Sequence, residues 1–141
     1  MGTAITYFSN NRLQPIYYPE TALTISVAIA PSQTIAQGTV LGELTASPGV
    51  YSPYASGHTD GTQTAKVIAE YGMVTDSSGN ITFSSTAGTF GGPFGETYLT
   101  APVFYKGTFA TADLVGLDAT AVTDLGRLIQ GTTTSGVIEL S

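Results

Sequence analysis

The amino-acid sequence predicts an α+β protein that is mostly β, with a small β-sheet or barrel-like core, one short helix and an extended N-terminal arm. Apolar residues alternate with polar or small ones in several short stretches bounded by turn residues, which is the period of a β-strand. One stretch near the C-terminus instead repeats apolar residues every three or four positions, as a helix face does. Only 10% of the 141 residues are charged, against about 25% in an ordinary soluble domain. Such a composition suits a β-rich protein that covers part of its surface by association.

The clearest strands lie in the second quarter of the chain. The first covers residues 40–45, and Ser47-Pro48-Gly49 ends it with residues typical of turns. A second strand follows at 50–54, and its proline indicates an edge position. A polar loop closed by Asp60-Gly61 then leads to a third strand, in which Val67, Ala69, Tyr71 and Met73 alternate with the residues between them.

A further strand precedes this core. Its apolar residues alternate strictly with small or polar ones until Pro31 ends the run, and they are Leu23, Ile25, Val27 and Ile29. Burying four aliphatic side chains contributes about 6–12 kcal/mol, whereas ordering the backbone of about eight residues costs about 8–16 kcal/mol. The strand is therefore unstable alone, and exposed it would promote aggregation. It must pair with the core sheet or with another chain, and the residues alone leave both possibilities open.

The first part of the chain shows no such regularity. Residues 1–20 mix polar and aromatic positions without a clear period, and two prolines interrupt them. We therefore interpret residues 1–32 as an N-terminal arm and residues 33–141 as the core domain.

Two loops rich in Gly and Ser follow the third strand. The spacing of Asp76, Gly79 and Asn80 hints at a calcium loop, but the bidentate Glu of an EF-hand is missing downstream, so a hairpin turn is the better interpretation. Residues 84–96 contain no Lys of the kind that a phosphate-binding loop needs. Their Phe90 and Phe94 either fold back on the domain or contact a neighbouring chain.

The C-terminal part combines strands with the single predicted helix. Residues 97–115 are expected to form two strands separated by Pro102, and Asp118 is a typical helix N-cap. A helix is expected over 119–130, with Gly131 as its stop, since apolar residues recur there at helical spacing. They are Val122, Leu125, Leu128 and Ile129, and a terminal strand follows at Val137-Ile138-Glu139-Leu140.

Composition and charge exclude several classes of protein. Four basic residues against ten carboxylates disfavour a nucleic-acid partner, which would need a basic surface. No cysteine is present for disulfides or thiolate chemistry, and the N-terminus lacks the pattern of a signal peptide. The longest apolar-leaning stretch, residues 21–30, is too short to span a membrane.

The sequence also offers little for catalysis. His58, the only histidine, lies two residues before Asp60, but no nucleophile is identifiable and Asp60 already belongs to a turn. One His without Cys does not supply the three or four ligands of a zinc site. We therefore expect no enzymatic activity, no metal and no cofactor, although a carboxylate pair built from distant residues is an alternative that one sequence leaves open.

Several segments in order resemble the lambda-like head decoration proteins of tailed bacteriophages. The similarity covers roughly residues 32–141. It is carried by Gly38-Thr39-Val40-Leu41-Gly42-Glu43-Leu44, by Tyr51-Ser52-Pro53-Tyr54, by the fold motif Asp60-Gly61-Thr62-Gln63-Thr64-Ala65 before an apolar strand, and by Ala101-Pro102-Val103 through Gly107 with Ala112 and Leu114. The loop at 84–96 is longer than the family pattern, and the arm does not align with it.

The resemblance implies a capsid decoration, or cement, protein. Such a protein would bind the major capsid protein as a homotrimer at three-fold positions on the outer surface of the expanded shell, after assembly in the host cytoplasm, with no direct contact to nucleic acid or membrane. The strand argument, rather than the family motifs, makes the arm the expected capsid-binding element by strand addition. The residues expected to bind the capsid are Ile16, Tyr17, Tyr18, Leu23, Ile25, Val27 and Ile29.

A second interpretation belongs to another class. Exposed Tyr and Phe side chains would also suit a virion or cell-surface adhesin that binds carbohydrate. Such a module would bind glycans and be indifferent to capsids.

Overall fold

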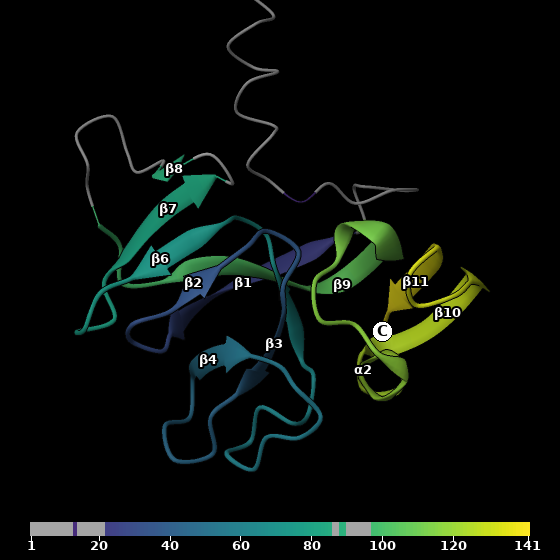
Figure 1. Cartoon of the computed structure of the whole chain (residues 1–141), viewed down its shortest axis with the longest axis horizontal. Coiled ribbons are helices and arrows are strands. Elements are labelled where there is room, and N and C mark those ends of the chain that lie inside the picture. Colours follow the sequence, from purple (N-terminus) through teal and green to yellow (C-terminus); the bar gives the residue numbers. More distant parts are fainter. Residues whose placement is uncertain (1–12, 14–21, 86–87, 90–96) are drawn as a thin grey trace, which may run out of the picture.

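The computed structural model describes residues 13, 22–85, 88–89 and 97–141, and strands dominate these ranges (Figure 1). The strands are β1 (Leu23–Ile29), β2 (Thr34–Ile35), β3 (Val40–Glu43), β4 (Val50–Pro53), β5 (Val67–Ala69), β6 (Met73–Thr75), β7 (Ile81–Ser85), β8 (Gly88–Thr89), β9 (Ala101–Ala110), β10 (Gly126–Gly131) and β11 (Gly136–Leu140). A 3-10 turn, η2 (Thr111–Asp113), and a helix, α2 (Ala119–Leu125), lie between β9 and β10. The prediction of a mostly β, α+β fold is confirmed.

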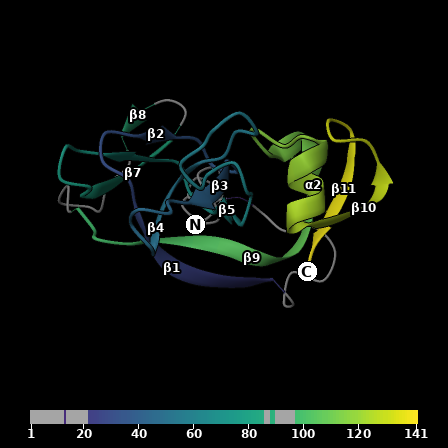
Figure 2. The ribbon, with the colours of Figure 1, turned by 90° about the horizontal axis from the view of Figure 1, so that it is seen from below.

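Five strands close into a small barrel. The large sheet has the order β1-β4-β3-β5-β9-β11-β10, and β1 also pairs with β9, so the pairings β1-β4-β3-β5-β9 return to β1. β1 runs parallel to β4 only at Ala28 and Ile29, and the other pairings of the ring are antiparallel. Figure 2 shows β1 and β9 running side by side along one face of the molecule.

The barrel interior and its covered end form one apolar cluster. Every strand of the ring contributes to it, and a second sheet of order β2-β6-β7-β8 adds three further residues from one side. The barrel residues are Val27, Ile29, Leu41, Tyr51, Val67, Ala69, Ala101 and Val103, and the small sheet supplies Ile35, Met73 and Ile81. Because side chains alternate along each strand, the intervening residues face the outside of the barrel.

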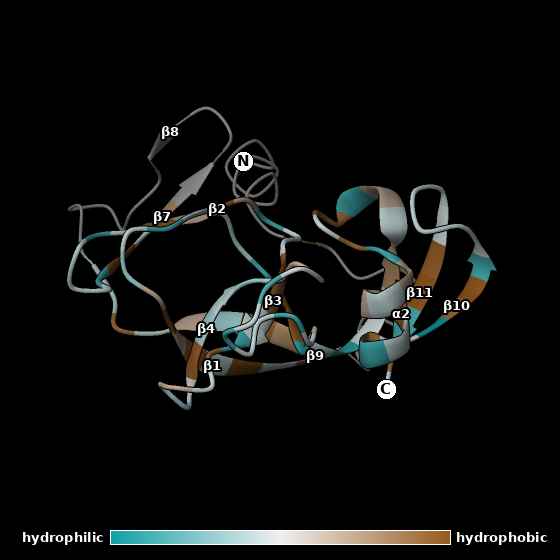
Figure 3. Cartoon of the chain, turned by 60° about the horizontal axis from the view of Figure 1, so that its bottom comes forward, coloured by the Kyte–Doolittle hydropathy of each residue, from teal (hydrophilic) through white to brown (hydrophobic). Residues whose placement is uncertain are grey.

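A second apolar cluster covers that outer face. Val40, Ile68 and Phe104 point outward from β3, β5 and β9 and pack with residues of α2 and β11. Phe104 and Phe109 have ring centroids 4.9 Å apart, which joins the barrel part of β9 to its C-terminal part. The apolar residues of β11 appear in brown beside α2 in Figure 3. The helix and the hairpin β10–β11 therefore form one end of the molecule, and the small sheet forms the other (Figure 1).

The predicted helix is correct at its start and wrong at its end. Asp118 caps α2, since its Oδ1 accepts a hydrogen bond from the backbone N–H of Ala121 at 2.8 Å. The helix stops at Leu125 and the chain continues as β10, so Gly131 ends a strand rather than a helix. A Cβ on Gly126 would collide with the carbonyl oxygen of Glu139. The close pairing with β11 therefore takes the chain out of the helix.

Two other predictions about turns and strands have clear outcomes. Asp76 closes the hairpin between β6 and β7, as predicted: its Oδ1 accepts hydrogen bonds from the N–H groups of Ser78 and Asn80. Residues 101–110 form one continuous strand through Pro102, where two strands had been expected. The loop residues Phe90 and Phe94 lie outside the described residues.

The structure describes two parts of the segment that we interpret as the arm, Leu13 and β1. β1 is part of the barrel, and Leu13 is 2% exposed in the outer cluster and donates its N–H to the carbonyl of Glu70 at 2.6 Å. A division at residue 32 would remove one of the five barrel strands. The residues before Leu13 and those from 14 to 21, with Ile16, Tyr17 and Tyr18, lie outside the described part of the chain.

Candidate binding surface at the open edge of β1

β1 has one edge fully paired and the other only partly paired. On one side Leu23–Val27 lie opposite Lys106–Ala101 of β9. On the other side β4 reaches only Ala28 and Ile29, because the turn at Ser47–Gly49 takes the chain away to β3. Among the residues that the structure describes, none pairs with the outer edge of β1 from Leu23 to Val27. We call this edge segment the β1 slot.

The proline in β9 determines which backbone groups point into the slot. Pro102 lies opposite Ser26, has no N–H, and accepts a hydrogen bond from the N–H of Glu70 at 3.4 Å with its carbonyl. Ser26 and Pro102 are thus a non-hydrogen-bonded pair, and such pairs alternate with hydrogen-bonded ones along an antiparallel ladder. Ile25 and Val27 therefore bond to β9, while the N–H and C=O groups of Thr24 and Ser26 point into the slot.

Further along the strand, the backbone of an even-numbered residue again faces away from β9. The N–H of Ala30, an even-numbered residue like Ser26, donates to the carbonyl of Tyr51 in β4 at 2.9 Å. The slot is therefore the continuation of the line that β4 occupies beside Ala28 and Ile29. A strand added there would meet backbone groups already at the correct spacing.

The side chains around the slot are apolar and exposed. Leu23 and Ile25 are each 43% exposed, whereas Val27 and Ile29 on the same face are 7% and 3% exposed inside the barrel. Tyr105, 39% exposed, is the extra residue where the register of β9 shifts opposite Leu23 and Thr24. The apolar face of the strand thus runs from the closed barrel out to solvent at its N-terminal end.

The opposite edge of the large sheet is protected in ways that the slot is not. β10 carries a bulge at Ile129, where the register shifts between Leu128 and Gln130, and an arginine, Arg127, paired with Glu139. Bulges and charges are the features by which proteins prevent an exposed edge from adding strands. β1 has no charge and no proline in its seven residues. It is therefore the edge most able to accept another strand within the described ranges.

The motif 60–65 forms a compact loop beside the barrel. The hydroxyl of Thr62 donates to Asp60 Oδ1 at 2.5 Å, and the Thr62 N–H donates to the same oxygen at 3.0 Å. Both bonds lower the pKa of Asp60, and the bond from the Thr62 hydroxyl has the larger effect. The N–H of Ala65 donates to Asp124 Oδ2 at 3.0 Å, which connects the loop to α2. The motif therefore has a structural role.

His58 belongs to the same loop and has no catalytic geometry. Its Nδ1 lies 2.7 Å from the Thr62 hydroxyl oxygen, whose proton is directed to Asp60, so the histidine is the donor. The hydroxyl itself is buried, since Thr62 is 1% exposed. A substrate cannot reach this hydroxyl as a nucleophile.

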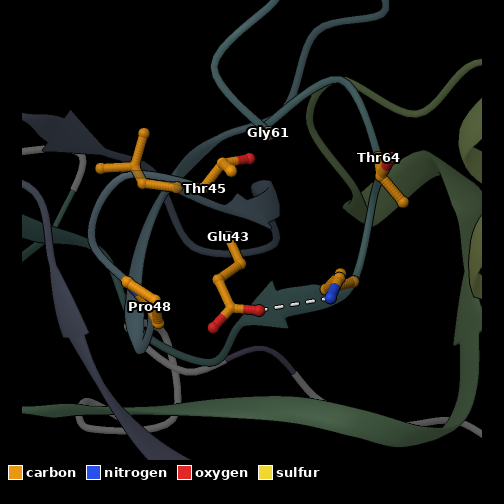
Figure 4. Close-up of a pocket in the computed structure, with 7 residues that line it drawn as sticks. Glu43, Thr45, Pro48, Gly61 and Thr64 are labelled. Atoms are coloured by element: carbon orange, nitrogen blue, oxygen red, sulfur yellow. Dashed lines mark hydrogen bonds and ion pairs between the residues drawn. The ribbon is translucent and has the colours of Figure 1, made fainter.

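A shallow hollow of about 440 Å³ lies between this loop and the turn after β3. Figure 4 shows Glu43 at its centre, with its ion pair drawn as a dashed line. Glu43 Oε1 lies 3.2 Å from Lys66 Nζ and Oε2 accepts from the N–H of Gly49 at 2.8 Å. Both bonds lower the pKa of Glu43, and the bond from the Gly49 N–H has the larger effect. The carboxylate thus connects the turn after β3 to the residue that precedes β5.

The rest of the described chain contains no metal-ligand cluster and no candidate membrane helix. Within the described ranges no three His, Asp or Glu side chains gather as metal ligands would, and no helix has the length and apolar character to cross a bilayer. The hydroxyl of Tyr54 donates to Asp118 at 2.8 Å. Burial is the main cause that raises the pKa of Tyr54 to about 12, and this hydrogen bond is the second cause. This tyrosine stays protonated and stabilises the helix start.

Comparisons with known proteins leave the family open. No family model, no curated protein and no solved structure matches the chain.

Sequence reasoning located part of this surface. The alternating pattern in residues 21–30 identified the strand that the structure bounds at Leu23–Ile29, and it placed Leu23 and Ile25 in one set with Val27 and Ile29. The structure separates that set into two exposed and two buried residues. Lys106 and Tyr105 were missed, because nothing local in the sequence places β9 beside β1.

Proposed function

We propose that the chain is a head decoration protein of a tailed bacteriophage, which binds the outer surface of the expanded shell as a trimer at three-fold positions and stabilises it. The motifs quoted above support this proposal through their resemblance to that family. The observation that carries it is the unprotected β1 slot, because a sheet edge of this kind binds a partner protein by strand addition. The low charge of the chain, 10% of residues, suits a protein whose surface lies against neighbours.

The structure changes the mechanism expected from the sequence. β1 stays in the barrel, so it presents its outer edge to the capsid protein rather than leaving the body to insert into the shell. A contact of this size is weak alone. Three copies held on one trimer bind the second and third sites at high effective concentration, which gives firm attachment.

Co-sedimentation with shells tests the proposal. Purified protein is mixed with expanded, decoration-free shells of the bacteriophage whose genome encodes this chain, and the bound copies are measured by densitometry. We expect saturation near one copy per capsid subunit. Absence of binding to shells shown to be expanded would contradict the proposal and lead to a glycan-binding screen.

A matched pair of variants tests the surface. Ile25→Asp places a charge in the slot and should weaken shell binding by about tenfold or more, since each copy in the trimer loses its contact. Ile129→Asp is the control, because Ile129 is 44% exposed at the bulged edge. Equal binding by both variants would exclude the slot as the capsid contact.

A further inference from the structure

The β1 slot has a defined length and end. It extends from Leu23 to Val27, which is about 16 Å of strand, and it ends at the turn before Val50, where β4 takes over the same line. The slot therefore accommodates about five residues of extended chain. Two backbone positions, Thr24 and Ser26, offer their N–H and C=O groups to it.

The size of the slot argues against a second copy of the chain as its occupant. Stable association of two folded domains involves about 20 to 30 residues on each side, far more than a strand of five residues supplies. An extended segment of a larger partner needs only the slot, because the partner is held elsewhere as well. The occupant is therefore better sought among extended peptides than among folded copies.

Charge determines one end of the occupant. Lys106 lies opposite Leu23, so its side chain is on the same face as the exposed pair Leu23 and Ile25. Lys66 and Arg127 are paired with Glu43 and Glu139, but Lys106 is exposed and has no carboxylate partner among the described residues. Along the slot itself β1 carries no charge.

We infer that the β1 slot binds an extended peptide segment of the partner protein as an added strand, with apolar residues over Leu23 and Ile25 and a carboxylate beside Lys106. The identity of that partner as the capsid protein rests on the proposed function. The chemistry of the bound peptide is argued from the slot alone. The backbone groups of the added strand accept from and donate to those of Thr24 and Ser26, and its acidic residue pairs with the ammonium group of Lys106. This extends the line of β4 along the whole of β1.

A proline substitution tests the slot without breaking the barrel. Ser26→Pro removes an N–H that points into the slot and has no partner among the residues that the structure describes, so the fold should be retained. Ser26→Ala removes only the side chain and is the matched control. If Ser26→Pro fails to fold by circular dichroism, Thr24→Pro replaces it, because its N–H points the same way.

The probe is the capped peptide acetyl-Val-Thr-Val-Thr-Glu-amide, whose two Val and Glu side chains lie on one face of an extended strand, titrated to millimolar concentration against ¹⁵N-labelled full-length protein. We expect amide shifts centred on Thr24 and Ser26, loss of at least about tenfold in affinity with Ser26→Pro, and no change with Ser26→Ala. A peptide ending in Lys instead of Glu should bind more weakly, and Lys106→Met should remove that difference. Shifts elsewhere, no binding, or equal binding by the proline variant would overturn the inference.

Two further measurements separate this inference from the proposed function. If wild-type protein binds shells and Ser26→Pro binds equally well, the strand-addition inference fails while the capsid function stands. If the peptide binds at the slot but the protein does not bind shells, the capsid function fails while the slot stands. A dimer in sedimentation velocity that Ser26→Pro abolishes would assign the slot to a second copy and overturn the peptide assignment.

Discussion

Gly61 is a position at which the loop before β5 accepts no side chain. Its φ is +105°, and a Cβ there would lie against the carbonyl oxygen of Glu43 and 2.7 Å from the backbone nitrogen of Thr45. The backbone conformation and the crowding both require glycine. The glycine of the fold motif is thus explained by close packing of the loop on the end of β3.

We expect Gly61→Ala to lower the free energy of unfolding by about 2–4 kcal/mol, from the strained φ and the displaced backbone together. Urea denaturation measures this change. Gly49→Ala isolates the conformational part, because Gly49 has φ +90° but open space around it, and should cost about 1–2 kcal/mol. Gly57→Ala, with open space and no positive φ, should have little effect. Equal costs at Gly61 and Gly49 would show that the crowding does not matter.

Tyr54 provides a prediction about pH. Its pKa is raised to about 12 by burial and by its hydrogen bond to Asp118, against about 10 in an unfolded chain. The neutral phenol therefore stabilises the fold below pH 10, and this contribution is lost as pH rises from 10 to 12, since the unfolded chain releases the proton first.

We expect Tyr54→Phe to lower the free energy of unfolding at neutral pH by about 1 kcal/mol, the usual net value of one hydrogen bond. The stability of the variant should also decrease less than that of the wild type as the pH rises above 10, because the variant has no phenol at position 54 to ionise. Melting temperatures between pH 8 and 11 measure both effects. Identical slopes for the two proteins over that range would contradict the assignment.

Gly126 is where a helix becomes a strand. The segment from Val122 to Ile129 has helical spacing throughout, but α2 ends at Leu125 and β10 begins at once. Glu139 of β11 lies against Gly126, and Leu128 pairs with Ile138. The apolar residues after the glycine therefore serve a sheet, although their spacing is that of a helix.

We expect Gly126→Ala to reduce the free energy of unfolding by about 2–4 kcal/mol, because a methyl group would force β10 away from β11. Chemical denaturation followed by circular dichroism measures it. Gln130→Ala, an exposed change in the same strand, is the control and should fall within about 0.5 kcal/mol of wild type. A neutral Gly126→Ala would show that the hairpin can shift to admit the methyl group.

At the scale of the whole molecule, closure of the barrel determines the role of β1. β1 joins β9 to β4, and Val27 and Ile29 fill the interior with residues from the other four strands. Without β1 the ring opens between β4 and β9. The strand therefore supports the fold through its buried half and offers the slot through its exposed half.

Deletions distinguish these two parts of the chain. We expect removal of residues 1–31 to abolish folding, since one barrel strand and the buried side chains of Leu13, Val27 and Ile29 are lost, which exceeds the marginal stability of a small domain. Removal of residues 1–12 keeps the buried Leu13 and should leave a folded protein. Dispersion of amide signals in ¹H–¹⁵N spectra measures both. A folded protein lacking residues 1–31 would place β1 outside the essential core.

The local structure of this protein could be predicted from its sequence alone. Strand period, turn residues and the Asp118 cap depend on neighbours within a few positions, and they predicted β1, β3, β11, the Asp76 turn and the start of α2 correctly. The division of the apolar set of β1 into buried and exposed residues, the end of α2, and the place of Lys106 beside the slot were decided only by the tertiary structure. These depend on which distant strands pair, because a strand's alternation specifies that one face is apolar but not which partner covers it.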